Sequence, residues 1–311
     1  DKIVLRGQDA EGFYVDNDIA LGHRRLSIID LGGGDQPIYN EDKSILVIFN
    51  GEIYNYLELK TELEKKGHKF KTKSDTEVLV HGYEEWKENM PKKLRGMFAF
   101  AVYDIKNKTL FLARDNFGIK PLYYYENNDT FMFASEIKSF LVHPDFKKEL
   151  NKDLIAPYLS FSFTPTKETL FKGVYRVDPG TSVTVKNKQV TTKRYYNLEF
   201  NQKDMSYEKA VSDIDKLMKD SVEKHMISDV EVGSFLSSGV DSSYLVALAR
   251  PDKTYTVGYT DQKYNEIEYA KTLTKELNIN NTSKIITKEE YLKIIPKIMY
   301  HLDEPTSDPA A

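Results

Sequence analysis

The second part of the chain, from Tyr207 on, alternates between helical and strand-like patterns, and this alternation constrains the fold most strongly. Strands are expected over 230–236, 254–258 and 283–287, and helices over 207–226, 242–249, 265–277 and 288–300. Strands that alternate with helices at this spacing form parallel βαβ units with right-handed crossovers. The sequence therefore predicts an α/β domain with a parallel sheet.

A hydroxyl-rich loop, Phe-Leu-Ser-Ser-Gly-Val-Asp-Ser-Ser at residues 235–243, joins the first expected strand to the next helix. Open parallel sheets bind ligands at such strand ends, and free N–H groups at a helix N-terminus favour anions. Asp241 would repel a bare phosphate, so this interpretation requires a divalent cation. The alternative is a serine-rich cap on an ordinary helix, and the spacing alone does not decide.

Residues 1–200 have a different pattern, in which short strands are separated by turns. A buried strand is expected over 44–49, hairpins over 97–113 and 122–134, and helices over 56–66 and 77–86. The segment 151–200 is expected to add a few edge strands. Antiparallel strands with a pair of helices are typical of an α+β domain. We therefore predict domains at 1–200 and 207–311, joined by a polar linker.

The composition reduces the number of possible partners, compartments and catalytic groups. The net charge is −4 with no basic block, which gives no electrostatic case for nucleic acid or an anionic membrane as a partner. No apolar run reaches the ~18 residues of a membrane span and no signal peptide is visible, so a cytoplasmic protein is expected. With no cysteine, the chain as given has no disulfide, thiolate ligand or cysteine nucleophile. Its six histidines show no familiar metal-ligand spacing.

Three short polar stretches of the first domain could bind a substrate, although each has a plainer interpretation. Asn50-Gly51 can be a simple turn, or it can supply an amide and an unhindered N–H to an oxyanion hole. Residues 74–77 match the capping box S-x-x-E, and a spare Asp75 carboxylate there could bind an ammonium. One arginine of residues 23–26 could hold a carboxylate, although surface arginines are usually only solvated.

Two further stretches, an acidic loop and an aromatic cluster, also have a functional and a plainer interpretation. An acidic loop at residues 301–309 contains three carboxylates, two of which could help to bind Mg²⁺, but acidic loops of this kind are common. The aromatic cluster Tyr123, Tyr124, Tyr125, Phe131 and Phe133 is interpreted as core.

Several motifs that occur in a fixed order give the chain a family resemblance over essentially all 311 residues. They are Arg6-Gly7-x-Asp9-x-x-Gly12, Gly22-His23-x-Arg25-Leu26-Ser27-Ile28-x-Asp30, Phe49-Asn50-Gly51-Glu52-Ile53-Tyr54-Asn55, Ser74-Asp75-Thr76-Glu77, Gly96-Met97-Phe98-Ala99-Phe100, Arg114-Asp115-x-x-Gly118-x-Lys120-Pro121-Leu122-Tyr123, Ala134-Ser135-Glu136-Ile137-Lys138 and the serine loop. With these motifs the chain resembles the glutamine-dependent asparagine synthetases of the bacterial asparagine synthetase B type.

The resemblance implies a glutaminase domain of the N-terminal-nucleophile type, an antiparallel αββα sandwich, followed by a parallel-sheet ATP-pyrophosphatase domain that is incomplete at its C-terminus. It implies a ligase that converts aspartate to asparagine through β-aspartyl-AMP, with ammonia released from glutamine. The implied substrates are glutamine, aspartate and ATP, with ATP and Mg²⁺ as the cofactors. A homodimer is left open.

The resemblance also implies roles for individual residues. Arg25 holds the glutamine carboxylate, and Asn50 and Gly51 form the oxyanion hole. Glu52 and Asp75 bind the polar end of the substrate. The implied ATP- and pyrophosphate-binding residues are Leu236, Ser237, Ser238, Gly239, Val240, Asp241, Ser242, Val257 and Gly258, with Asp241 also a candidate Mg²⁺ ligand.

The chain departs from the family pattern at several points. The family's nucleophile is an N-terminal cysteine that acts with its own α-amino group, and this chain contains none. Leu5 and Gln8 replace the usual His and Pro, and Ser238 replaces a usual glycine. The later family segment Ser-Gly-Glu-Gly-Ala-Asp-Glu would lie beyond Ala311. The chain also begins without methionine, so we expect it to cover the middle of a longer enzyme.

Two other functions stay open. A relative without glutaminase activity could use ammonia or close a ring as β-lactam synthetase-like enzymes do, but the retained glutamine-pocket residues argue against it. A non-catalytic glutamine- or nucleotide-binding module would keep the binding residues and lack turnover. Aspartate-stimulated ATP–pyrophosphate exchange separates a ligase from such a module.

Overall fold

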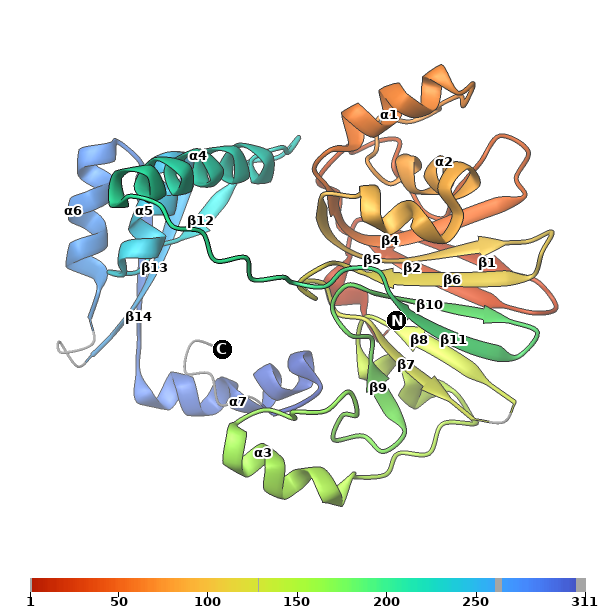
Figure 1. Cartoon of the computed structure of the whole chain (residues 1–311). Helices are drawn as coiled ribbons and strands as arrows, with labels where there is room; N and C mark the ends of the chain where they lie inside the picture. The colour runs from red at the N-terminus through yellow and green to blue at the C-terminus, as the bar shows by residue number, and fades with distance from the viewer. Residues whose placement is uncertain (1, 128, 261–264, 306–311) are drawn as a thin grey trace. The chain divides into compact units, whose positions relative to one another are not determined.

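The computed structural model describes residues 2–127, 129–260 and 265–305, which form two compact units (Figure 1). The first unit comprises the chain up to Glu199 together with the segment from Met299 on. The second unit is Phe200–Ile298. The expected boundary near residue 200 lies where the first unit ends, whereas the segment from Met299 on groups with the first unit.

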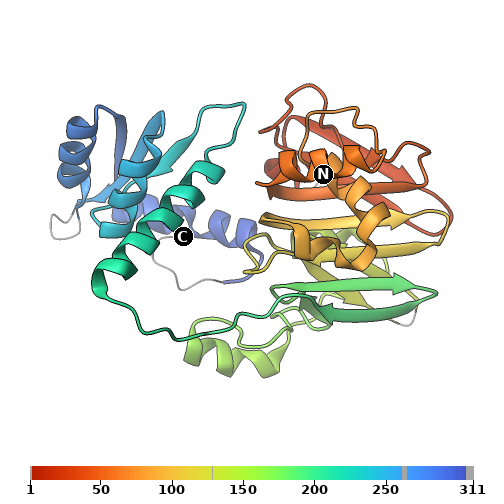
Figure 2. The same ribbon diagram turned by 45° about the horizontal axis from the view of Figure 1, so that its top comes forward.

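A six-stranded antiparallel sheet forms the centre of the first unit, with the strand order β11-β10-β6-β5-β4-β3. The strands are β3 (Ile38–Tyr39), β4 (Ile45–Ile53), β5 (Gly96–Asp104), β6 (Thr109–Arg114), β10 (Thr181–Lys186) and β11 (Gln189–Arg194). Helices α1 (Tyr56–Lys65) and α2 (Glu77–Trp86) lie on one side of this sheet (Figure 2). Their apolar stripes, such as Leu63 and Leu79, pack on Val47 and Phe100 of the sheet.

A second layer of strands covers the other face of the central sheet. It consists of the hairpin β1 (Ala10–Val15) and β2 (Ala20–Arg25), and of a sheet ordered β8-β7-β9, with β7 (Tyr123–Glu126), β8 (Phe131–Ala134) and β9 (Val174–Arg176). Leu21, Tyr124 and Phe133 pack against Ile48 and Leu112 between the layers. The 3-10 helix η3 (Ile137–Val142) packs on the outer face of β7 and β8 through Ile137 and Phe140. The order of layers agrees with the expected antiparallel αββα sandwich.

The strands and helices expected in the first unit are confirmed, and the aromatic cluster at residues 123–133, which was expected to be core, is partly buried and packs against the core. The expectation of edge strands in 151–200 is wrong for β10, which lies inside the sheet between β6 and β11. Its hydroxyl-rich sequence resembles an edge strand, yet Thr181, Ser182 and Val183 are buried. The remaining elements are η1 (Val4–Arg6), η2 (Lys87–Lys93), η4 (Lys152–Leu154) and α3 (Ile155–Phe161).

The second unit contains a parallel sheet with the strand order β12-β13-β14, as the alternating pattern predicts. Its elements are α4 (Tyr207–His225), β12 (Gly233–Phe235), α5 (Val240–Ala249), β13 (Lys253–Tyr259), α6 (Ile267–Leu277), β14 (Asn280–Ile286) and the first part of α7 (Lys288–Leu302). Leu236, Val246 and Ala270 form its small buried core. Within the described residues, no helix is long and apolar enough to cross a membrane.

Candidate functional site

A polar pocket with a volume of about 230 Å³ lies in the first unit, beside the end of β4. Its walls come from β2, β4, the loop before α2 and the loop that carries Lys120. The five residues implied to bind or activate glutamine all line it, and they are Arg25, Asn50, Gly51, Glu52 and Asp75. A larger cavity of about 820 Å³ is lined by residues of both strand layers. Its lining residues include His23 and Asn50, which also line the pocket.

Asn50 and Gly51 lie on β4, which is paired with β5 along its whole length. The Asn50 side chain is on the same strand face as Ile48, and its buried Nδ2 has no hydrogen-bond partner among the described residues. Gly51 has φ +150°, and a Cβ there would lie 2.0 Å from the Met97 carbonyl oxygen, so only glycine fits. An oxyanion hole requires hydrogen-bond donors that are free to meet a substrate oxygen. The Asn50 amide has no partner in the described part of the chain, and the glycine after it has no side chain to shield the backbone, so this pair suits that role.

Arg25 is buried at the end of β2, with 6% of its side chain exposed. Its Nη1 donates to Asp35 Oδ1 at 2.9 Å, and its Nη2 donates to the carbonyls of Ile29 and Asp30 at 3.0 and 2.6 Å. A Cβ on Gly34 would lie 2.4 Å from Nη2, so a larger residue there would displace the guanidinium from its present position. Because the Asp35 side chain is 70% exposed, a substrate carboxylate could take its place on Nη1.

Asp75 is buried in the pocket wall, where its Oδ2 accepts a hydrogen bond from the Ile53 backbone N–H at 2.9 Å. Burial, together with the nearby Glu52 carboxylate, raises the pKa of Asp75 to about 6. The carboxylate is therefore charged at neutral pH at an energetic cost, which an incoming ammonium would relieve.

The helix start expected at residues 74–77 is confirmed, because α2 begins at Glu77, and Ser74 Oγ accepts from the Thr76 backbone N–H at 3.2 Å. The reciprocal bond of a capping box does not form. The buried Glu77 carboxylate instead accepts hydrogen bonds from the backbone N–H groups of Lys71 and Thr72 at 2.8 and 2.7 Å. Burial opposes its charge, but these bonds, with those from His81 and the Thr72 hydroxyl, lower its pKa to about 2. Glu77 thus fixes the loop that carries Asp75.

The structure adds His23 and Lys120 to the pocket, neither of which was singled out as a site residue. His23 Nε2 lies 2.9 Å from the Phe49 carbonyl oxygen, and burial lowers the pKa of His23. Burial also lowers the pKa of Lys120. Asp115 holds the Lys120 loop by accepting hydrogen bonds from the backbone N–H groups of Phe117, Ile119 and Lys120.

The residues implied to bind ATP lie at the ends of two adjacent parallel strands of the second unit. Leu236 follows β12 and is bonded to β13 through Tyr255 O and the Thr256 hydroxyl, while Val257 and Gly258 lie near the end of β13. Helix α5 begins at Val240, two residues earlier than expected, with Gly239 as its cap. Its first turn contains Asp241, which is exposed.

Hydroxyl groups of the serine loop bond largely within the loop. Ser237 Oγ lies 2.8 Å from Ser242 Oγ and accepts from the Gly239 backbone N–H at 3.2 Å. Ser238 donates to Glu266 Oε1 at 2.7 Å. The geometry fits a phosphate site and equally fits a serine-rich helix cap.

The acidic loop 301–309 does not offer two carboxylates for Mg²⁺ in its described part. Asp303 pairs with Lys138 at 2.9 Å, and Glu304 pairs with Arg176 while accepting from the Leu170 backbone N–H. All of these residues belong to the first unit. The third carboxylate, Asp308, lies outside the described residues.

Comparison with known proteins shows the family. Residues 1–196 match the family described as glutamine amidotransferase domain, and residues 213–311 match the family described as asparagine synthase. The chain therefore belongs to the glutamine amidotransferase family, and its second part has the asparagine synthase domain.

Curated relatives of the chain include glutamine-hydrolyzing asparagine synthetase 1 of Bacillus subtilis, 46% identical over 99% of this chain and 50% of the relative. Glutamine-hydrolyzing asparagine synthetase 3 of the same organism is 36% identical over 84% of this chain and 44% of the relative. The chain thus spans about half the length of these relatives. Among solved structures, the chain is similar to the glutamine phosphoribosylpyrophosphate amidotransferase from B. subtilis, with 20% sequence identity and a TM-score of 0.41. The match covers 85% of this chain and 51% of that structure's chain, and a likeness of this degree carries no argument about function.

Proposed function

We propose that this chain is part of a ligase that makes asparagine from aspartate, ATP and the ammonia of glutamine. The observation that carries the proposal is the convergence of Arg25, Asn50, Gly51, Glu52 and Asp75 on one pocket. These residues come from three separate segments, and together they offer a cation, an amide donor and two carboxylates. An amino acid has the complementary charges at its α-carbon.

In the proposed glutaminase site, Arg25 binds the α-carboxylate of glutamine, and Asp75 with Glu52 binds its α-ammonium. Asn50 Nδ2 and the Gly51 backbone N–H stabilise the oxyanion that forms at the side-chain amide. The nucleophile that the family uses is an N-terminal cysteine, which is absent from the sequence given. We therefore assign no covalent step to any residue of this chain.

In the proposed synthetase site, the serine loop and the first turn of α5 bind pyrophosphate, and Leu236, Val257 and Gly258 contact the adenosine. Mg²⁺ often takes one or two carboxylates and completes its shell with phosphate and water. The exposed Asp241 fits that donor set and would hold the ion there, where Mg²⁺ would supply charge neutralisation. The same proposal includes a cytoplasmic enzyme that acts on small molecules and has no nucleic-acid partner. A homodimer is compatible with it.

The experiment uses the protein produced from its complete gene. Glutamate release from glutamine, aspartate-stimulated ATP–pyrophosphate exchange and asparagine formation are measured in parallel. All three are expected. Exchange without glutamate release would indicate the ammonia-dependent or β-lactam synthetase-like alternative, and product analysis with other carboxylates would identify the acceptor. Ligand binding without any turnover would indicate a binding module and overturn the proposal.

A further inference from the structure

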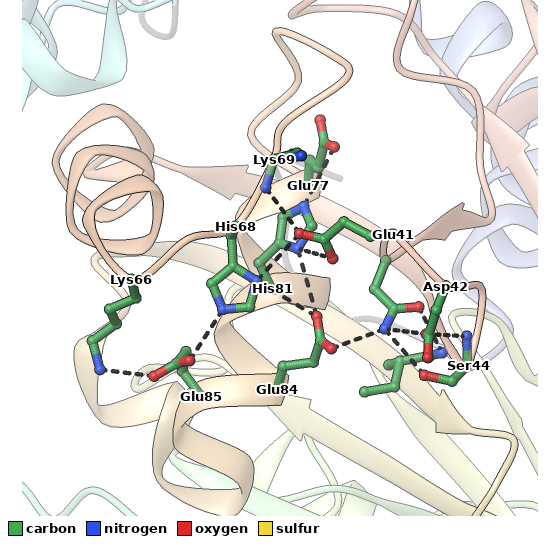
Figure 3. Close-up of polar contacts among 12 residues, drawn as sticks. Glu41, Asp42, Ser44, Lys66, His68, Lys69, Glu77, His81, Glu84 and Glu85 are labelled. Carbon is green, nitrogen blue, oxygen red and sulfur yellow. Dashed lines mark hydrogen bonds and ion pairs between the residues drawn. The ribbon is translucent and has the colours of Figure 1, made fainter.

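A second group of titratable side chains gathers in the first unit, and none of its members lines the polar pocket (Figure 3). Glu41 lies in the turn between β3 and β4, His68 lies in the loop after α1, and His81 and Glu84 lie one turn apart on α2. We call these four residues the His–Glu cluster. One ligand atom of each lies within 4.8 Å of all the others.

The separations within the cluster match the edges of a metal coordination sphere. His81 Nδ1 lies 3.4 Å from Glu41 Oε2 and 3.6 Å from Glu84 Oε2. His68 Nδ1 lies 3.5 Å from Glu41 Oε1 and 3.7 Å from Glu84 Oε2. A tetrahedral zinc ion with bonds of about 2.0–2.2 Å places its ligand atoms about 3.3–3.6 Å apart. The four imidazole–carboxylate separations are therefore close to those around one ion, with either oxygen of Glu41 within reach.

Two of the ligand atoms have no hydrogen-bond partner among the described residues. They are His81 Nδ1 and Glu84 Oε2, both of which are buried. The His81 side chain is only 1% exposed, so water cannot readily satisfy its inward-facing nitrogen. A buried nitrogen beside a carboxylate oxygen, with no hydrogen bond to either, is costly unless the nitrogen is protonated or a cation lies between them.

Groups outside the cluster also hold its four side chains, as is usual for metal ligands. His68 Nε2 lies 3.2 Å from Glu85 Oε1, and His81 Nε2 lies 3.5 Å from Glu77 Oε1. A proton on each Nε2, facing a carboxylate, leaves each Nδ1 lone pair directed into the cluster. The carboxylates are held too. Glu84 Oε1 accepts from Asn40 Nδ2 at 2.9 Å, and Glu41 Oε1, which also faces His68 Nδ1, accepts from the Lys69 N–H at 2.8 Å.

We propose that Glu41, His68, His81 and Glu84 form a binding site for one divalent metal ion of the zinc type. Two neutral imidazoles and two carboxylates balance the charge of such an ion, and four protein ligands make a closed site. The side chains of Glu41 and Glu84 are 34% and 27% exposed, which leaves a path for the ion to enter. The alternative is an ion-pair network in which both imidazoles are protonated.

A metal ion at this site would join the β3–β4 turn, the loop after α1 and helix α2. His81 also lies beside Glu77, which fixes residues 71 and 72 ahead of Asp75. The site therefore has a structural role, because it helps to hold the loop that carries Asp75 in the pocket wall. This inference does not depend on the proposed function.

The experiment is a zinc titration of chelator-treated full-length protein without a histidine tag, monitored by calorimetry and checked by elemental analysis after dialysis. Because the complete protein may hold other zinc, the proposed site is defined by what His68→Gln and Glu41→Gln remove. Both positions are partly exposed, so these variants should fold. Each is expected to weaken the site by at least about tenfold. His143→Gln, an exposed histidine outside the cluster, is the matched control.

Two further measurements separate a metal site from an ion-pair network. Cobalt in place of zinc should give the intense visible absorption of a tetrahedral ion, which the two cluster variants should lose and the control should keep. Zinc should also raise the Tm of the wild-type first unit by roughly 2–4 °C. If zinc binding and the cobalt spectrum are the same in wild type and cluster variants, the proposal is wrong.

Discussion

The polar pocket and the serine loop differ in how much of a ligand site the protein builds by itself. In the pocket, Arg25 and Asp75 are buried, and the amide donor of Asn50 has no partner among the described residues. In the loop, Ser238, Val240 and Asp241 are exposed, and the serine hydroxyls already have partners. Buried groups that lack partners point to a ligand, whereas an exposed and satisfied loop does not. The structure thus supports the first half of the proposed reaction more directly than the second.

The largest expected effect is that of Asn50→Ala in the full-length enzyme. Removal of one oxyanion donor should lower kcat for glutamine hydrolysis by about 10²–10³-fold. Ammonia-dependent asparagine synthesis and ATP–pyrophosphate exchange should change little, because Asn50 lies in the first unit and the residues proposed to bind ATP lie in the second. Steady-state glutamate release and exchange, measured on one preparation, check this. A comparable loss in both assays would contradict the separation of the two sites.

Asp75→Asn tests whether the charged Asp75 carboxylate lowers the free energy of unfolding. The difference between a pKa of about 6 and the ordinary 3.8 corresponds to about 3 kcal/mol. The folded state holds this proton more tightly than the unfolded state, so the wild-type penalty is absent below about pH 4, grows up to about pH 6 and is complete above it.

The variant should therefore match wild type in stability below about pH 4 and exceed it by up to about 3 kcal/mol at pH 7. Urea unfolding at several pH values measures this difference, and glutamine affinity should fall at the same time. A variant less stable than wild type at pH 7 would show that the charged carboxylate stabilises the fold.

Arg25→Ala should raise the KM for glutamine by about 10–100-fold, since a hydrogen bond to a charged group contributes about 1.5–3 kcal/mol. Ammonia-dependent synthesis should stay largely intact. Asp35→Asn is the matched comparison, because it loosens the same guanidinium without removing it. A normal KM in Arg25→Ala would remove this residue from the pocket.

The sequence pattern predicted the elements of the second unit and most of the central sheet and helices of the first, and the family resemblance predicted five residues of the pocket. Neither predicted contacts that depend on how distant segments fold together. His23 and Lys120 are 97 positions apart and share a wall only because of how the strands and the Asp115 loop fold. The reciprocal bond of the capping box does not form, because the Glu77 carboxylate accepts hydrogen bonds from the backbone of the preceding loop. The His–Glu cluster was missed because its ligands come from three segments, so no single spacing reveals it.

The smallest expected effect is that of Asp241→Asn, and it decides whether the serine loop is a site at all. We expect aspartate-stimulated ATP–pyrophosphate exchange to fall by about tenfold, equivalent to about 1.4 kcal/mol, while glutamine hydrolysis is unchanged. The effect is modest because Asp241 is exposed, and water can replace one carboxylate of an ion that phosphates also bind. Excess Mg²⁺ should restore part of the loss. Unchanged exchange at limiting Mg²⁺ would favour the plain helix cap, because a cap at this position needs no carboxylate at the second residue of α5.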